Sequence, residues 1–295
     1  MMAMNEFRSA LFIPGGNEKM LNKASSIDAD LIIFDLEDSV LEAEKPTARR
    51  LVQQVLQDEA LAQRSLAVRI NAMDTPHLQE DLAVVMAGQP DIILLPKLEN
   101  GEQLLQLSAL LDSLEAKNNI PAKSTKVIAI TGETPTGVLG FDSIDNPCDR
   151  LVGLSWGPED LATELGATAN RDGEGKFLPP FELLRTLCLL KAKQLGVQAI
   201  DTVFTGIGNS EGLSAECIAA HSIGYTGKLA IHPSQVELIN QAFSPTEEEL
   251  IRAKKIVDLF AANPNAGALQ LDNKMVDIPH LKQAQRLLAR SDNSG

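Results

Sequence analysis

Short apolar runs recur along the chain and alternate with stretches of helical periodicity. Eight runs of about five residues are rich in branched side chains: SALFIP (9–14), LIIFDLED (31–38), LAVRIN (66–71), DIILLPKLE (91–99), KVIAITGE (126–133), LVGLSWGPED (151–160), DTVFTG (201–206) and GKLAIHP (227–233). Most of them are almost continuously apolar, as expected for strands of a parallel sheet that is covered on both faces. The pattern therefore predicts eight buried parallel strands.

The segments between these runs have the periodicity of amphipathic helices. The clearest are TARRLVQQVLQ (47–57), GEQLLQLSALLDSL (101–114), FELLRTLCLLKAKQL (181–195) and SAECIAAHSIG (214–224). Eight strand–helix alternations over about 230 residues favour an α/β fold of the (β/α)8 TIM-barrel type over an open doubly wound sheet. No Gly-x-Gly-x-x-Gly motif opens a helix, which weakens a dinucleotide-binding alternative. We expect the barrel in residues 1–245 and a C-terminal helical extension in residues 246–295.

The extension contains an acid in an unusual place. A helix is expected near Pro245 to Ala262, followed by the break NPNAGA (263–268) and the segment KMVDIPHLKQAQRL (274–287). In that segment Asp277 is either the N-cap of a new helix, with Pro279 in its first turn, or an acid with a chemical role. Local sequence alone favours the N-cap.

Composition narrows the class of protein. The net charge of -14, with few clusters of Lys or Arg, argues against nucleic acid or an anionic membrane surface as the main partner. The three cysteines, Cys148, Cys188 and Cys217, lack metal-ligand spacing, and a reduced cytoplasm is their natural setting. No apolar run approaches the roughly 20 residues that span a bilayer, and the N-terminus lacks a long apolar signal region. We expect a cytoplasmic protein.

Polar side chains follow the predicted strands, where the loops of such a barrel converge. They are Asp35, Glu37 and Asp38 after the second run, Arg69 and Asn71 at the third, Lys97 and Glu99 at the fourth, Glu133 at the fifth, and Glu159 and Asp160 at the sixth. Crowded carboxylates repel one another unless protons or a divalent cation offset their charge. Oxygen ligands without Cys or His favour Mg²⁺ or Mn²⁺ over Zn²⁺, and Glu133 and Asp160 are the candidate ligands. The alternative is that these acids cap helices.

Arg69 is the only arginine within a strand-like apolar run. A charge in such a place is rarely buried without a partner. Arg69 is therefore either a clamp for a carboxylate or enolate oxygen, or one half of a salt bridge to Asp35 or Glu37. Phe12, at the end of the first run, is expected to pack at the rim.

Seven fragments resemble a known family in the same order along nearly the whole chain. They are RSALFIPGGNEK, DADLIIFDLEDSV, VRINAMDTP, IILLPKLEN, GETPTG, WGPEDLATELGA and GKLAIHPSQV. Together they are similar to the citrate lyase beta-subunit-like family within the HpcH/HpaI aldolase group. The resemblance implies a TIM barrel, Mg²⁺, and carbon–carbon cleavage or formation next to a coenzyme A thioester.

The resemblance also implies roles for individual residues. Glu133 and Asp160 would be the metal ligands, Arg69 the substrate clamp, and Asp35, Glu37 and Asp38 the shell that orients metal-bound waters. Phe12, Lys19 and Lys23 would face coenzyme A, with the two lysines on one helical face. The backbone at Leu229 and Ala230 would line the same groove.

A comparison within the family concerns the tail. Citrate lyase beta subunits would stop soon after the barrel, whereas stand-alone malyl-CoA and citramalyl-CoA lyases carry a tail resembling GALQLDNKMVDIPHLKQAQ (267–285). In those enzymes the tail acid reaches the site of a neighbouring subunit, which implies that Asp277 is an acid/base in a homo-oligomer, a trimer or hexamer.

The implied activity is a Mg²⁺-dependent lyase that cleaves or forms a 3-hydroxyacyl-CoA such as malyl-CoA or citramalyl-CoA, with acetyl-CoA and a 2-oxo acid as the other reactants. Two alternatives stay open: a citrate lyase beta subunit that acts on an acyl-carrier-protein thioester, and a non-catalytic assembly subunit that keeps the barrel.

Overall fold

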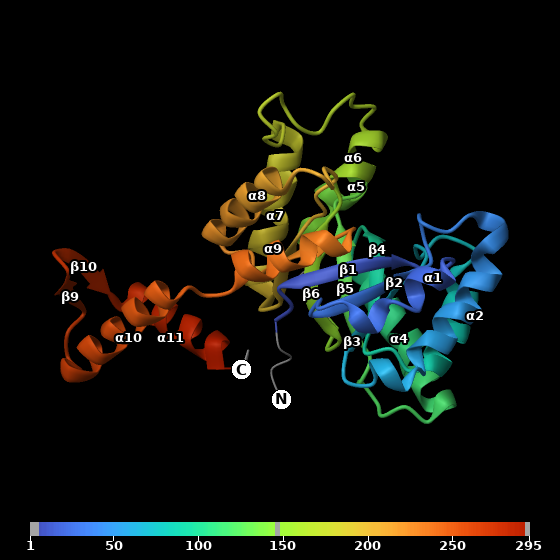
Figure 1. Cartoon of the computed structure of the whole chain (residues 1–295), viewed down its shortest axis with the longest axis horizontal. Coiled ribbons are helices and arrows are strands. Elements are labelled where there is room, and N and C mark those ends of the chain that lie inside the picture. Colours follow the sequence, from blue (N-terminus) through green and yellow to red (C-terminus); the bar gives the residue numbers. More distant parts are fainter. Residues whose placement is uncertain (1–5, 145–147, 293–295) are drawn as a thin grey trace. The chain divides into compact units, whose positions relative to one another are not determined.

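The structure is a computed structural model that describes residues 6–144 and 148–292. It contains two compact units, one formed by Phe7–Ala242 and the other by the chain from Phe243 onward. The strands and helices of the first unit are coloured from blue to orange in Figure 1, and those of the second from orange to red. Among the described residues, none of the helices is both long enough and apolar enough to span a membrane.

The first unit is the predicted TIM barrel. Its strands are β1 (Ser9–Pro14), β2 (Leu31–Asp35), β3 (Ser65–Arg69), β4 (Ile92–Leu98), β5 (Lys126–Thr131), β6 (Leu151–Trp156), β7 (Gln198–Asp201) and β8 (Gly227–Ala230). Neighbours in this order pair in parallel, and β8 pairs with β1 to close the barrel. Branched and small side chains such as Leu31, Ile33, Ile92 and Ile128 fill one continuous core cluster.

The seventh strand lies upstream of its predicted position. The sequence predicts it in residues 201–206, whereas β7 is Gln198–Asp201 and residues 202–206 form a loop. Val203 lies in this loop, but its apolar side chain packs against the core cluster as that of a strand residue would. Hydrophobicity alone does not separate these two placements.

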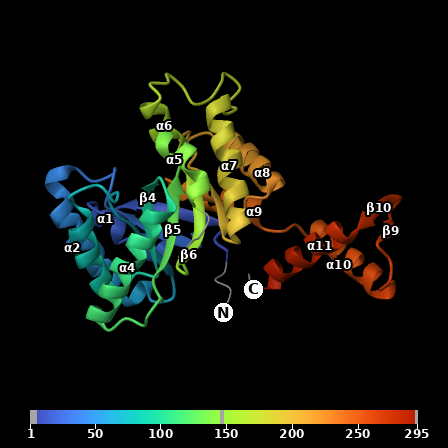
Figure 2. The same ribbon diagram turned by 180° about the vertical axis from the view of Figure 1, so that it is seen from behind.

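Helices follow the strands and cover the barrel (Figures 1 and 2). They are α1 (Glu18–Leu21), α2 (Lys45–Leu56), α3 (Leu78–Val85), α4 (Gly101–Asn118), α5 (Pro135–Leu139), α6 (Pro158–Glu164), α7 (Pro179–Leu195), α8 (Ser210–Ile223) and α9 (Pro233–Phe243). Side-chain caps fix several of their starts, as expected where a βα loop enters a helix. Asn100 accepts from the amide of Gln103 at α4, and Thr134 accepts from that of Gly137 at α5.

The second unit is a helical hairpin with a small two-stranded sheet. It contains α10 (Glu247–Ala262), β9 (Ala268–Leu271), β10 (Lys274–Asp277) and α11 (Ile278–Asp292). Its apolar core joins both helices to β10 through side chains such as Ile256, Phe260 and Val276. Asp272 and Asn273 have positive φ values of 49° and 59°, as a tight two-residue hairpin turn requires. The C-terminal helices are confirmed, while the β-hairpin between them was not predicted.

Candidate active site

Strand register brings Arg69 and Asp35 together. The two residues are paired at the carboxyl ends of β3 and β2. Arg69 Nε lies 2.6 Å from Asp35 Oδ1, and Nη2 lies 2.7 Å from Oδ2, so the contact is bidentate. Burial by itself raises the pKa of Asp35, but Arg69 offsets this and holds the pKa below its usual value. The salt-bridge alternative for Arg69 is therefore present in the structure.

The loop after β2 adds two more acids to this pair. Arg69 Nη1 lies 3.1 Å from Glu37 Oε2 and 3.5 Å from Asp38 Oδ2. The loop is held in place because the Glu37 amide donates to Asp35 and the Lys45 ammonium donates to the Glu37 carbonyl. Burial raises the pKa of Glu37, although Arg69 and Lys97 favour its charged form. Its buried Oε2 atom makes no hydrogen bond within the described residues.

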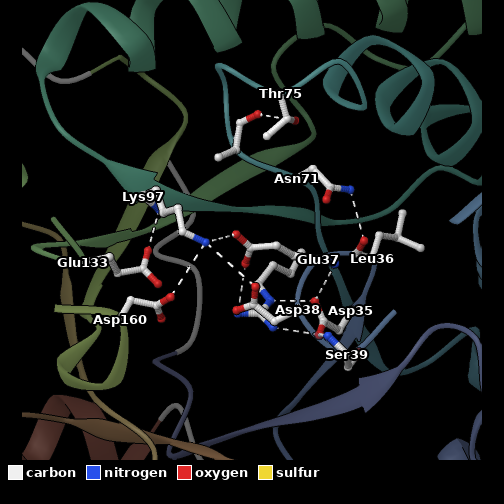
Figure 3. A network of polar contacts seen from close by, with 12 residues as sticks. Asp35, Leu36, Glu37, Asp38, Ser39, Asn71, Thr75, Lys97, Glu133 and Asp160 are labelled. Carbon is white, nitrogen blue, oxygen red and sulfur yellow. Dashed lines mark hydrogen bonds and ion pairs between the residues drawn. The ribbon is translucent and has the colours of Figure 1, made fainter. Parts of the chain in front are cut away.

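Lys97 is the central cation of this site (Figure 3). Its Nζ atom lies 2.5 Å from Glu37 Oε1, 3.9 Å from Asp38 Oδ1 and 3.9 Å from Asp160 Oδ1. Its backbone amide donates to the Glu133 carboxylate. From the sequence, Lys97 was predicted only as a polar residue at the end of a strand. Its positive charge among so many acids at strand ends was the signal that could have predicted its central position.

Glu133 is an almost fully buried acid of the group. It follows β5, with only 2% of its surface exposed. Burial raises its pKa well above the ordinary value, and Glu37 and Asp160 raise it further by repulsion. Glu133 can approach this closely because residue 157 is glycine: a Cβ atom at Gly157 would lie 2.4 Å from Glu133 Cγ. Asp160 comes from the first turn of α6.

The donor set fits a hard divalent cation. Among the residues described, no group of three or more His, Cys, Asp or Glu side chains is arranged to hold a metal ion. Mg²⁺, however, is usually bound by one or two carboxylates and keeps several waters. Glu133 and Asp160 supply two carboxylates. Burial and the negative charges of Glu37 and Asp160 raise the pKa of Glu133, and a bound cation would offset the repulsion among these carboxylates.

The candidate coenzyme A residues differ in their surroundings. Phe12 is partly buried, and the guanidinium of Arg69 stacks 4.8 Å from its ring centroid. Lys19 and Lys23 are exposed, but α1 ends at Leu21 and Lys23 precedes a 3-10 turn. The expected common α-helical face for the two lysines is therefore wrong, because the helix is only one turn long.

Leu229 and Ala230 are buried strand residues. Their positions in β8 pair with Ala10 and Leu11 of β1. The Leu229 side chain belongs to the core cluster of the barrel. If Leu229 and Ala230 contact a ligand, they do so through backbone atoms.

Asp277 ends β10 and caps α11. Its Oδ1 atom lies 3.4 Å from the amide nitrogen of His280, in the manner of an N-cap, and 2.5 Å from His280 Nδ1. The hydrogen bond with His280 lowers the pKa of Asp277. These contacts agree with the N-cap interpretation of Asp277. The spacing of three residues between Asp277 and His280 is the sequence signal for such a contact.

Comparison with known proteins identifies the family. The model of the HpcH/HpaI aldolase/citrate lyase family matches residues 8–233, and that of a C–C bond lyase of the TIM-barrel fold matches residues 187–295. The chain belongs to the HpcH/HpaI aldolase/citrate lyase family. The resemblance seen in the sequence fragments is thus confirmed.

Members of this family with different activities are about equally similar to the chain. The citrate lyase subunit beta of Leuconostoc mesenteroides subsp. cremoris is 34% identical over 95% of this chain and 92% of its own length. A (3S)-malyl-CoA thioesterase of Cereibacter sphaeroides is 34% identical over 97% of this chain and 95% of its own length. The crystal structure of Mycobacterium tuberculosis CitE in complex with magnesium, acetoacetate and coenzyme A covers 99% of both chains, with a TM-score of 0.79 and 31% identity.

The tail does not separate the two activities. We expected citrate lyase beta subunits to end soon after the barrel. The Escherichia coli citrate lyase subunit beta, however, matches 98% of this chain over 292 residues. The extension that carries Asp277 is therefore shared with citrate lyase beta subunits, and that prediction is wrong.

Proposed function

We propose that this protein is a Mg²⁺-dependent carbon–carbon lyase that cleaves or forms a 3-hydroxyacyl-CoA, such as malyl-CoA or citramalyl-CoA. The observation that carries the proposal is the buried carboxylate of Glu133 next to Asp160, at the mouth of a barrel of this family. A CitE structure with 31% identity contains magnesium, acetoacetate and coenzyme A, which are the classes of ligand the proposal requires.

Glu133 and Asp160 would hold the cation, and Mn²⁺ would suit the same oxygen ligands. The bound ion supplies Lewis-acid chemistry on the oxygen of the developing 2-oxo acid carbonyl. Asp35, Glu37 and Asp38 would orient waters of the ion, because their carboxylates lie around Arg69 and Lys97 at the same site. The acid-rich loop after β2 then serves the ion rather than the organic substrate.

Arg69 would stabilise the thioester enolate that forms on cleavage. A guanidinium has five N–H donors. Asp35 takes two of them, and Nη1 faces Glu37 and Asp38. Donor capacity on Nη2 is left for an oxygen of the substrate, while the paired acids fix the plane of the group.

Phe12, Lys19 and Lys23 would contact coenzyme A, with the backbone of Leu229 and Ala230 in the same groove. The two exposed ammonium groups suit the phosphates of the cofactor. Phe12 is held against Arg69 at 4.8 Å, which gives the ring a fixed place at the rim of the site.

Asp277 would transfer the proton at the carbon next to the thioester, in the barrel of a neighbouring subunit of a homo-oligomer, a trimer or hexamer. The hydrogen bond with His280 lowers the pKa of Asp277 and so favours its carboxylate form. A carboxylate is the form that removes a proton from acetyl-CoA in the direction of condensation, and the same group returns it on cleavage.

A citrate lyase beta subunit that acts on an acyl-carrier-protein thioester is the second candidate, since such subunits are as similar to the chain as the thioesterase is. The test is turnover of free malyl-CoA, citramalyl-CoA and citryl-CoA by the purified chain with Mg²⁺. Acetyl-CoA and a 2-oxo acid are the expected products of the lyase, whereas free coenzyme A indicates thioester hydrolysis. Turnover only of a carrier-protein thioester supports the second candidate, and a chain that neither reacts nor binds Mg²⁺ is a non-catalytic subunit.

A further inference from the structure

Lys97 has an unusual backbone in addition to its central position. Its φ angle is 50°, in the left-handed region that non-glycine residues rarely adopt. The pairing of β4 with β5 is irregular at the same place, between Leu95 and Leu98. A register shift at the end of a strand re-aims the side chain there, as a β-bulge does. Here it places both the amide and the ammonium of Lys97 against acids of the site.

These contacts join two groups of acids that come from different loops. The Lys97 amide donates to Glu133, and Nζ lies 3.9 Å from Asp160, so both candidate metal ligands contact this residue. On its other side Nζ contacts Glu37 at 2.5 Å and Asp38 at 3.9 Å. Figure 3 shows the ammonium between the two groups. Lys97 is thus a covalently attached cation that contacts both groups of acids, whereas Arg69 contacts only the acids that follow β2.

The chemistry of Lys97 is electrostatic. Burial by itself lowers the pKa of its ammonium, but the hydrogen bond and charge of Glu37 raise it above the ordinary value. A lysine that attacks a carbonyl needs a free amine and therefore a lowered pKa. Carboxylate oxygens of Glu37, Asp38 and Asp160 lie within 3.9 Å of Lys97 Nζ and give it the opposite environment, one that favours the ammonium.

We propose that Lys97 is a positioning residue that draws the acids of both groups together and limits the affinity of the site for the divalent cation. The inference rests on the proposed function, because it assigns the cation to Glu133 and Asp160. An ammonium a few ångström from a doubly charged ion lowers its affinity by about tenfold even with the dielectric constant of water. The same ammonium stabilises the metal-free site, where it offsets the repulsion among the acids.

The experiment compares Mg²⁺ binding and metal-free thermal unfolding in Lys97→Met and Lys97→Arg. Lys97→Met keeps an unbranched side chain, shorter by the terminal atom, and the backbone amide, but it removes the charge. We expect it to bind Mg²⁺ at least tenfold more tightly by calorimetry and to unfold at a lower temperature without metal. Lys97→Arg is the matched control that keeps the charge, and its Mg²⁺ affinity should stay within a few fold of wild type. A lysine with a purely structural role predicts weaker binding in Lys97→Met.

A second pair of variants covers the case in which Lys97→Met does not fold. Glu37→Gln and the double variant Glu37→Gln, Lys97→Met differ only at residue 97, where the second lacks the ammonium, and the double variant should bind Mg²⁺ more tightly. Unchanged or weaker binding on loss of the ammonium overturns the inference.

Glu133→Gln separates this inference from the proposed function. If Glu133→Gln abolishes Mg²⁺ binding while removal of the Lys97 charge leaves the affinity unchanged, the metal site stands and the role of Lys97 falls. If the wild-type chain binds no Mg²⁺, both fall.

Discussion

Gly157 gives the sharpest test of the position of Glu133. A methyl group at residue 157 would lie 2.4 Å from Glu133 Cγ and 3.0 Å from its carboxyl carbon. Gly157 has a φ angle of -119°, so alanine fits its backbone without strain. The Gly157→Ala substitution therefore acts through contact with Glu133.

The size of the effect follows from this overlap. Ordinary van der Waals contact begins at about 3.5 Å, so Glu133 must move by roughly 1 Å. Overpacking of this kind costs about 1–3 kcal/mol of stability. In a chain of this size that lowers the melting temperature by about 2–12 °C. If Glu133 is a metal ligand as proposed, its displacement by about 1 Å should reduce turnover roughly 100-fold.

The assay measures turnover, Mg²⁺ affinity and melting temperature in Gly157→Ala, Gly157→Ser and Gly173→Ala. Gly157→Ser also adds the Cβ atom but places a residue that N-caps well at the start of α6, so it separates steric displacement of Glu133 from the poor capping of alanine. Gly173 has no atom within 4 Å of an added Cβ, and alanine there should leave all three quantities unchanged. Native turnover and Mg²⁺ affinity in Gly157→Ala would refute the placement of Glu133 as a ligand.

Three further predictions concern single side chains. Arg69→Lys should reduce turnover more than tenfold and lower the free energy of unfolding in urea by about 1–3 kcal/mol, because one ammonium cannot replace the two hydrogen bonds from the guanidinium to buried Asp35. Native kinetics with lowered stability would make Arg69 purely structural. Metal-free protein should lose stability as the pH rises above 4.5, the ordinary pKa of Glu133, because the raised pKa keeps a proton on the folded chain that the unfolded chain has released. Thermal unfolding of Glu133→Gln should lack this component of the slope, and identical slopes would contradict the raised pKa. Asp277→Asn keeps the cap and should lower turnover roughly 100-fold or more with folding intact. Mixing Asp277→Asn chains with Glu133→Gln chains should restore some activity, because a mixed oligomer would contain one site with both residues intact. An inactive Asp277→Asn variant that mixing never rescues would mean that Asp277 acts in the barrel of its own chain.

The order of the strands was readable because it depends on local pattern. Buried parallel strands have continuous apolar runs, and helices between them have a period near 3.6, so eight alternations indicate a barrel without any long-range information. Where the pattern was ambiguous it failed locally, as at β7, where Val203 contacts the core from a loop. The short hairpin that ends at Asp277 was also missed, because two strands of four residues carry little periodic signal.

The sequence by itself also indicated that Asp35, Glu37, Arg69 and Lys97 lie close together, since they follow strands whose carboxyl ends converge. Only the tertiary structure decided how they pair. Arg69 is bound to Asp35 because strand register places the two opposite each other. Lys97 reaches Glu37 across 60 residues of sequence, and its amide reaches Glu133 across 36. Such contacts depend on barrel closure, on the register shift between β4 and β5, and on the close approach that Gly157 permits, and local periodicity carries no information about any of them.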